Sequence, residues 1–406
     1  MRRRLWMVEG GHEYDGRLFM PLDEAAVTKS AEEMKARGLK SVAISAIFSP
    51  LDPTHEKRAA ELVAKVIPDA IITCSSDLGR IGLLERENAG LLNAALADLS
   101  RDTIAAFEKA IRDSGIAAPL FITQNDGTVA EASQARRLPV YSFASGATNS
   151  MRGAAYLSGL SDAMVIDVGG TTTDVGQLKN GFPREANSVV KVGGVRTLFR
   201  MPDLLSIGLG GGSHVQLDPL KVGPISVGYR LLRDGIAFGG KQLTTTDVAI
   251  AAGVLTLGDK AKVAHLDAAT CKKVFAEAAR LSEEAIDRMK TEAGDVPLIA
   301  VGGGAFLIPE KLPGVSKVIH VQHGDCANAV GAAIAQVSGE CDQIFKDMTR
   351  NEALAAAQGI ANDRAVAAGA ERKTLSTIES EDMPLAYLPG NSVRVRVRVV
   401  GDVASS

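Results

Sequence analysis

The chain has 406 residues, of which 46% are hydrophobic, and its formal net charge is −3. A chain of this size can bury more than one core, which indicates two or three domains, and the small negative charge argues against a nucleic-acid groove. The arginines after Met1 are not followed by an apolar run, and no stretch of about eighteen apolar residues occurs, so neither secretion nor membrane spanning is predicted. Four scattered cysteines without C-x-x-C spacing are typical of reduced thiols, and a cytoplasmic location is expected.

Short apolar runs alternate with longer helical patterns, which is the rhythm of an α/β protein. The predicted strands of the first part are, in chain order, residues 40–48, 71–74, 119–123, 140–143 and 163–168. The predicted helices between them are residues 54–65, 83–114 and 149–159. Glycines become frequent beyond residue 181, and helices dominate from residue 246. The later predicted elements are strands at 296–301, 317–321 and 393–400, and helices at 326–336 and up to about residue 364.

The most informative segment is the octapeptide Asp-Val-Gly-Gly-Thr-Thr-Thr-Asp, residues 167–174, which directly follows the apolar run 163–166. Its glycines allow a tight turn around a phosphate, to which backbone amides and hydroxyls can donate. A carboxylate at the end of the strand suits hydrated Mg²⁺. The strand resumes at 175–178 and turns at Asn180-Gly181, so a β-hairpin around the loop is predicted. A Walker A loop or a dinucleotide fingerprint would instead open a helix with a different glycine pattern.

A second glycine-rich element follows the strand predicted at 296–301. Gly302-Gly303-Gly304 would let the backbone approach a flat ring or a phosphate, although a tight packing turn explains such a triplet equally well. A phosphate hairpin, then a strand with three glycines, then Ala327-x-x-Val330-Gly331-Ala332-Ala333 is the order found in the ATPase fold of actin, heat-shock chaperones and sugar kinases.

Further segments make the resemblance specific. They are Phe48-Ser49-Pro50 with His55-Glu56, Leu84-Glu85-Arg86-Glu87-Asn88 with Leu92-Asn93-Ala94-Ala95, Gln124-Asn125-Asp126-Gly127-Thr128, Ser145-Gly146, Gly194-Val195-Arg196-Thr197, residues 208–213 and Thr246-Asp247. With the octapeptide, these segments resemble the hydantoinase A/5-oxoprolinase family over most of the chain. The resemblance implies an α/β, actin-like (ribonuclease H-like) ATPase fold, with two lobes built on mixed sheets and the nucleotide between them. Residues 1–160 are then the remainder of the first lobe, 161–338 the ATPase core and 339–406 a C-terminal helix and strand extension.

One departure from the family pattern concerns the start of the chain. Family members usually open with another hairpin of the Asp-x-Gly-Gly-Thr-x-Thr-Asp type, whereas residues 9–16 and 21–23 resemble a segment well inside the family's first domain. Roughly a hundred residues of the pattern are therefore expected to be missing, an amount on the scale of a small domain. The first lobe is expected to be incomplete, and a clamp with one phosphate loop is expected to bind nucleotide weakly. A start codon assigned too late and a degenerate protein are the two explanations.

The resemblance implies an ATP-dependent hydrolase subunit that opens a cyclic amide of the hydantoin or 5-oxoproline type, with ATP and Mg²⁺ as cofactors. Phosphorylation of the amide oxygen would create a leaving group, and catalysis would depend on positioning and charge stabilisation. The alternatives are an ATP-dependent ketone carboxylase subunit and a non-catalytic nucleotide-binding protein. The implied partners are a small cyclic amide and a hydantoinase B-like subunit in an oligomer, without nucleic acid or membrane.

The resemblance also implies site residues. Asp167 would hold Mg²⁺ through water, and Asp174 would support the hairpin and the metal, although a turn-stabilising carboxylate is an equal alternative. The phosphate contacts would come from Gly169, Gly170, Thr171, Thr172 and Thr173, and the adenosine contacts from Gly302, Gly303 and Gly304. Weaker candidates, for substrate binding or a hinge, are Asn125, Asp126, Gly210, Gly211 and Gly212.

Other charged groups have simpler explanations. Glu85, Arg86 and Glu87 are expected on a solvated or salt-bridged helix face. Arg394, Arg396 and Arg398 alternate with valines, which predicts a solvated face of a strand. The nearby pair His320 and His323 lacks an adjacent third metal ligand.

Overall fold

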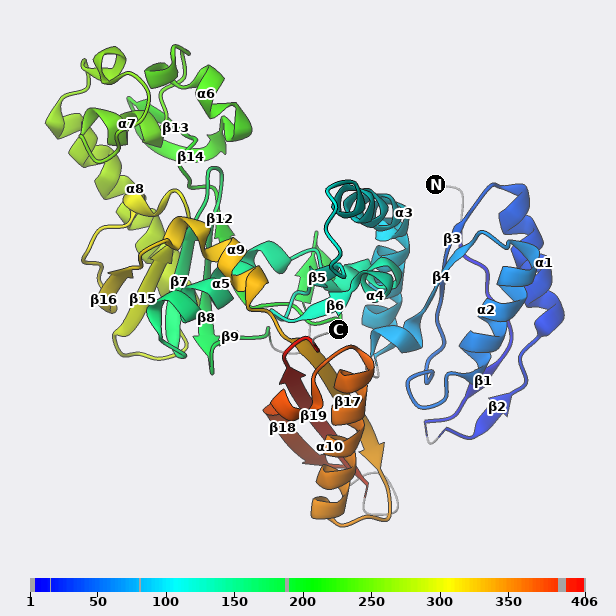
Figure 1. Cartoon of the computed structure of the whole chain (residues 1–406). Helices are drawn as coiled ribbons and strands as arrows, with labels where there is room; N and C mark the ends of the chain where they lie inside the picture. The colour runs from blue at the N-terminus through cyan, green and yellow to red at the C-terminus, as the bar shows by residue number, and fades with distance from the viewer. Residues whose placement is uncertain (1–3, 15, 80–81, 187–189, 386–391, 405–406) are drawn as a thin grey trace.

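The N-terminal unit is a small layered structure (Figure 1). The computed structural model describes residues 4–14, 16–79, 82–186, 190–385 and 392–404. The elements of this unit are β1 (Gly11–His12), β2 (Leu18–Met20), α1 (Glu24–Ala36), β3 (Ser41–Ile44), α2 (Thr54–Val66) and β4 (Ile71–Cys74). β3 and β4 pair in parallel, and α1 and α2 bury apolar residues against them. The predicted strand 40–48 ends early, because the backbone at Ala46 leaves the sheet to bond the side chain of Glu56.

A long helix connects this unit to the centre of the molecule. The elements are α3 (Leu83–Asp113), β5 (Phe121–Thr123), β6 (Val129–Glu131) and α4 (Ala132–Arg137). The strand predicted at 140–143 is wrong, since Pro139–Tyr141 forms a 3-10 turn instead. Proline at its first position fixes φ for a turn and removes an amide that a strand would need.

The central sheet has the strand order β12-β8-β7-β15-β16, with β9 paired to β8. Its strands are β7 (Ala163–Val168), β8 (Thr173–Lys179), β9 (Phe182–Pro183), β12 (Leu204–Ile207), β15 (Val296–Val301) and β16 (Val315–His320). β7 is apolar on both faces, as expected of a strand covered twice. Met164 and Ile166 face α8 (Ala268–Met289), whereas Val165 faces α5 (Ser145–Ser158) and α9 (Ala327–Ala333).

Helices α5 and α9 cross at very short range. A β-carbon at Gly153 of α5 would lie 1.9 Å from the carbonyl oxygen of Ala327, and one at Gly331 of α9 would lie 1.8 Å from that of Asn149. Only glycine lets two backbones approach this closely. The crossing fixes α5 against the face of β7 and β15.

A smaller unit lies at one end of the central sheet (Figure 1). Its elements are β13 (Ser213–Leu217), β14 (Leu220–Ser226), α6 (Leu231–Asp234) and α7 (Thr245–Ala251). Outside this unit, β10 (Val190–Val192) and β11 (Val195–Thr197) form a two-stranded sheet of their own, and β11 contacts α3. Helix α7 begins with a capping box in which Thr244 and Asp247 bond each other's backbone amides.

The C-terminal sheet has the order β18-β19-β17-β6-β5. Its later elements are β17 (Val337–Phe345), α10 (Arg350–Ala367), β18 (Ser376–Pro384) and β19 (Val393–Gly401). Four fully buried alanines of α10 let this helix pack flat on the valines of β19. The sheet joins strands from the predicted segments 1–160 and 339–406. The predicted domain boundaries after residues 160 and 338 stay a prediction.

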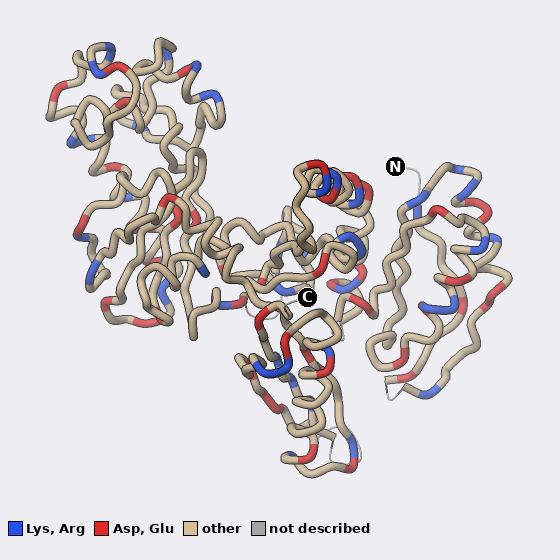
Figure 2. Tube along the Cα trace, in the orientation of Figure 1, with Lys and Arg blue, Asp and Glu red and all other residues tan. Residues whose placement is uncertain are grey.

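Lys and Arg are interspersed with Asp and Glu along the described trace (Figure 2). Among the described residues, no helix combines the length and the apolar composition needed to cross a bilayer.

Candidate phosphate site

The octapeptide forms the predicted β-hairpin. β7 and β8 are antiparallel, with Asp167 opposite Asp174 and Val168 opposite Thr173. At the other end of β8, Asn180 and Gly181 have φ values of 53° and 77°. Such paired left-handed residues make the tight two-residue turn for which Asn-Gly is favoured. The hairpin was predictable because every signal for it lies in neighbouring residues.

Two distant glycine-rich segments hold the loop of the hairpin. The amides of Gly211 and Gly212 donate to the carbonyls of Gly169 and Gly170, at 3.0 and 2.7 Å. The amide of Gly304 donates to the carbonyl of Val168 at 2.7 Å. The structure therefore brings three of the sequence-predicted segments together at the end of β7.

Most of these glycines are required by close packing. A β-carbon at Gly210 would lie 2.6 Å from the amide nitrogen of Thr171, and one at Gly302 would lie 2.3 Å from Oδ1 of Asp167. A β-carbon at Gly304 would lie 2.8 Å from the carbonyl oxygen of Gly169. Gly170 and Gly303 differ, since a β-carbon there would meet nothing within 4 Å. These two glycines leave open space on the outer side of the loop.

The outer side of the loop presents backbone amides. A peptide carbonyl and the following amide point in opposite directions, so the inward carbonyls of Gly169 and Gly170 direct the amides of Gly170 and Thr171 outward. Within the described chain, the amides of Gly170, Thr171 and Thr172 have no hydrogen-bond acceptor, and these residues are exposed. Consecutive outward amides form a concave anion site. Thr173 differs from its neighbours, because it is buried and its hydroxyl donates to the carbonyl of Leu209 at 2.7 Å.

Two half-buried carboxylates lie at the base of the loop. Burial raises the pKa of Asp167; a hydrogen bond from Ser150 opposes this effect, and the charge of Asp174 adds to it. Asp174 accepts a hydrogen bond from the hydroxyl of Ser206. No group of three or more His, Cys, Asp or Glu side chains suited to a metal occurs in the residues that the structure describes. Mg²⁺ needs no such cage, since it retains water and takes one or two carboxylates beside phosphate oxygens, so the residues present fit a Mg-nucleotide complex.

The weaker candidates Asn125 and Asp126 serve the framework. Asn125 donates to the carbonyls of Val140 and Arg200 at 2.9 and 3.2 Å, and its Oδ1 accepts from the amide of Ala144. Asp126 is buried and binds Thr128 and Arg398. These bonds connect β5 and β6 to their neighbours.

The predicted solvated face of β19 is wrong. Arg398 is 5% exposed and lies 3.1 Å from Asp126 and 2.6 Å from Glu185. Arg396 lies 3.0 Å from Glu185 and 2.8 Å from Glu379. Arg200 joins the same group through Glu185 and Glu340. The alternation with valines showed that the arginines share one face of the strand. It did not predict the carboxylates opposite them, because those come from other segments of the chain.

Arg86 also departs from its prediction, since it is fully buried. Its guanidinium donates to the hydroxyl of Ser75 at 2.9 Å and to the carbonyl of Ile47 at 2.9 Å. The carboxylate of Glu56, itself buried, accepts from Ser75 and from the amide of Ala46. This cluster joins α2, α3 and the end of β3. His320 and His323, by contrast, are exposed.

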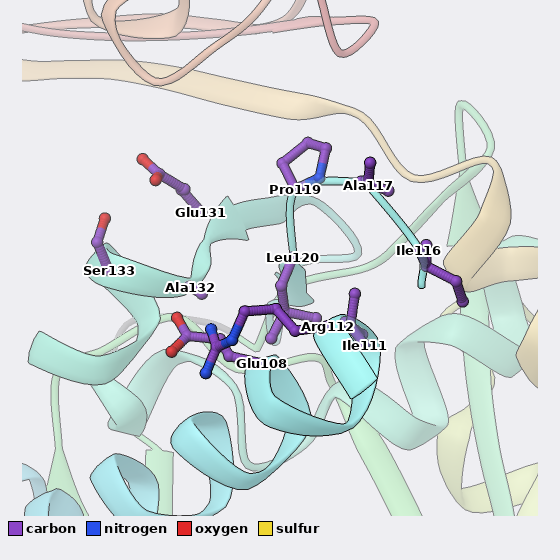
Figure 3. A pocket seen from close by; sticks show the side chains of 11 residues that line it. Glu108, Ile111, Arg112, Ile116, Ala117, Pro119, Leu120, Glu131, Ala132 and Ser133 are labelled. Atoms are coloured by element: carbon purple, nitrogen blue, oxygen red, sulfur yellow. The ribbon is translucent and has the colours of Figure 1, made fainter. Parts of the chain in front are cut away.

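A hollow of about 380 Å³ lies elsewhere, between the end of α3 and the start of α4 (Figure 3). Glu108, Arg112 and Ile116 line it, together with Leu120 and Glu131. Glu108 is already paired with Arg136 at 2.9 Å. None of the residues of the hairpin lines this hollow, so it is separate from the candidate site.

The chain is similar in sequence to known proteins of one family. Residues 86–296 match Hydantoinase/oxoprolinase, and residues 1–67 match the Hydantoinase/oxoprolinase N-terminal region. The chain belongs to the Hydantoinase/oxoprolinase family. The caprolactamase subunit alpha of Pseudomonas jessenii is 28% identical over 254 residues, which cover 60% of this chain and 36% of that protein. The chain thus spans well under half the length of this relative in the alignment.

Two solved structures share the fold of this family member. ATP-dependent caprolactamase from Pseudomonas jessenii superimposes with a TM-score of 0.71 at 18% identity, over 98% of this chain and 70% of that chain. Nucleotide-free acetone carboxylase superimposes with a TM-score of 0.69 at 18% identity, over 98% and 69%. These similarities confirm the predicted actin-like ATPase-type fold.

Proposed function

We propose that the chain is an ATP-dependent hydrolase subunit that opens a cyclic amide by phosphorylating the amide oxygen. The observation that carries the proposal is the loop of the hairpin, where three consecutive amides lack an acceptor among the described residues, and those of Gly170 and Thr171 face outward beside two carboxylates. Outward amides bind phosphate, and carboxylates beside them bind hydrated Mg²⁺. The family membership and the ATP-dependent caprolactamase of the same fold support the ATP-dependent chemistry.

The proposed roles follow the position of each group. The amides of Gly170, Thr171 and Thr172 would donate to phosphate oxygens, and Asp167 would hold Mg²⁺ through water. When bound, the metal would neutralise charge on the phosphates. Asp174 would add a second negative charge beside the metal and would stabilise the hairpin through its hydrogen bond from Ser206. Gly303 leaves room for adenosine because no atom lies within 4 Å of its missing β-carbon.

The cyclic amide is proposed from the relatives. An unactivated amide is a poor electrophile, and phosphorylation of its oxygen would provide a leaving group for attack by water. A caprolactam ring is a cyclic amide, as are hydantoin and 5-oxoproline, and caprolactamase matches this chain in both sequence and fold. A second subunit is proposed because the matched sequence relative is itself named a subunit.

A ketone carboxylase subunit is the second candidate function. The similarity to acetone carboxylase, with a TM-score of 0.69, supports it as well as the caprolactamase similarity supports the first. The same loop would serve both, since each chemistry begins with phosphoryl transfer to an oxygen of the substrate. The difference would lie in the groups that surround the acceptor.

The first test is calorimetric titration of Mg-ATP into the purified chain. Micromolar binding is expected, weakened at least about tenfold in Asp167→Ala, whereas Asp113→Asn, an exposed change at the end of α3, should bind normally. Phosphate release with hydantoin, 5-oxoproline or caprolactam would then support the hydrolase, and release with a ketone and bicarbonate would support the carboxylase. If neither the wild type nor a version extended with an upstream family segment binds Mg-ATP, the proposed function is wrong and a non-nucleotide role replaces it.

A further inference from the structure

Ser226, the last residue of β14, lies against the inner side of the phosphate loop. Its Oγ is 3.3 Å from the carbonyl oxygen of Gly170 and 3.5 Å from the hydroxyl oxygen of Thr171. The amide of Gly228 donates to the same Oγ at 3.0 Å. Because this amide occupies an acceptor position of the hydroxyl, the hydroxyl proton is available to the carbonyl of Gly170.

The carbonyl of Gly170 therefore has two donors, the amide of Gly212 at 2.7 Å and the hydroxyl of Ser226. This carbonyl and the amide of Thr171 belong to one planar trans peptide, so they point in opposite directions. A bond that holds the carbonyl inward also holds the amide of Thr171 outward. If the peptide flipped, a carbonyl oxygen would face the anion and repel it.

We propose that Ser226 is a positioning residue of the phosphate loop, which fixes the Gly170–Thr171 peptide with its amide facing the phosphate. The proposal rests on the proposed function, since that function assigns phosphate to this loop. No local pattern in the sequence marks Ser226, because its partners lie 55 and 56 residues away along the chain. Gly211, Gly212 and Gly304 act on the loop through their backbones, and Ser226 acts on the same loop through a side chain that substitution can remove.

The test compares Ser226→Ala with Ser226→Thr, which keeps the hydroxyl, and with Ser30→Ala. Ser30 also donates to a backbone carbonyl, at 2.8 Å, but lies in α1, far from the loop in sequence. The first measurement is amide hydrogen exchange of the free protein at Gly212, the other donor to the carbonyl of Gly170. Exchange is expected about fivefold faster in Ser226→Ala, the effect of losing one ordinary hydrogen bond. Both other variants should exchange as the wild type does.

The second measurement is the Kd of Mg-ATP. Ser226→Ala is expected to weaken binding about fivefold to tenfold, and Ser226→Thr to restore it to within about twofold of the wild type. Wild-type exchange and wild-type affinity in Ser226→Ala would overturn the positioning role and leave the proposed function standing. A fall in melting temperature with no rescue by threonine would also overturn it, because the serine would then matter only for packing. If no variant binds Mg-ATP, the proposed function fails, and the exchange rates still decide whether Ser226 holds this peptide.

Discussion

The protonation of Asp167 is expected to make nucleotide binding depend on pH. Burial raises the pKa of this carboxyl; Ser150 lowers it through a hydrogen bond, and the charge of Asp174 raises it further. A raised pKa means that Asp167 takes up its proton at a higher pH than an ordinary aspartate does. Only the ionised form can hold hydrated Mg²⁺. The affinity for Mg-ATP should therefore fall as the pH is lowered, and the fall should begin at a higher pH than an ordinary aspartate would give, which calorimetry over a series of pH values would measure.

Asp174→Asn provides the matched variant for this prediction. It removes a charge that raises the pKa of Asp167, so the fall in affinity should move to lower pH. Asp113→Asn changes an exposed carboxylate on another element and should leave the profile unchanged. An affinity that does not vary with pH, or a profile that Asp174→Asn does not shift, would show that the ionisation of Asp167 does not govern binding.

At the scale of elements, substitutions in the three glycines after β15 are expected to have different effects, one on the stability of the fold and one on the affinity for Mg-ATP. Gly302→Ala should destabilise the fold by on the order of 2 kcal/mol or more, because Gly302 has a φ of 90° and its β-carbon would overlap the carboxylate of Asp167. Gly303→Ala meets no atom within 4 Å and should melt as the wild type does. Its affinity for Mg-ATP should still fall about tenfold, since the methyl group would occupy the proposed adenosine side.

Thermal unfolding and calorimetry on the same two variants would check this prediction. Normal binding of Mg-ATP by Gly303→Ala would show that the three glycines do not contact adenosine. A tight packing turn would then explain all three of them. Normal stability of Gly302→Ala would instead show that the backbone beside Asp167 can move away from the overlap.

The elements differ in how far the sequence predicts them. The hairpin β7–β8 was predictable because its apolar run, its glycines and the Asn180-Gly181 turn that ends β8 are local signals. The convergence of Gly210 and Gly304 on the loop was not, since these glycines lie 39 and 135 residues along the chain from the loop residues Thr171 and Gly169 that they contact. β17 was missed although Val337, Gly339 and Cys341 alternate with polar residues, the period expected of a half-buried strand. β18, the edge strand that pairs with β19, exposes much of both faces and carries no such pattern.

At the scale of the whole molecule, an ion cluster around the buried residues Asp126 and Arg398 links all three predicted segments. The cluster consists of Asp126, Glu185, Arg200, Glu340, Glu379, Arg396 and Arg398. Asp126 comes from the loop between β5 and β6, Glu185 from the segment after β9, and Arg398 from β19. Charges removed from water need partners, and loss of one partner leaves the others unpaired. We therefore expect this cluster to hold the C-terminal sheet to the central sheet.

Asp126→Asn is the variant that tests this expectation. It should lower the free energy of unfolding at neutral pH by about 3 kcal/mol, because Arg398 and Arg200 would lose a buried carboxylate. Denaturant unfolding of the wild type and the variant would measure the difference. Asp363→Asn, which breaks an exposed pair with Arg372, should cost less than about 1 kcal/mol. A loss in Asp126→Asn as small as in this control would show that Asp126 does not stabilise the fold through this cluster.

The same cluster predicts how stability changes with acid. Burial alone would raise the pKa of Asp126 and of Glu185, but the neighbouring arginines lower both below their ordinary values. Each therefore contributes stability that is complete above its unfolded pKa, near 4, and is lost as the pH falls through its lower folded value. Glu379 acts in the opposite sense, since burial keeps its pKa raised, and its cost disappears on protonation. The difference in free energy of unfolding between wild type and Asp126→Asn should thus shrink below about pH 4. A difference that persists unchanged in acid would mean that the ionised form of Asp126 is not what stabilises the fold.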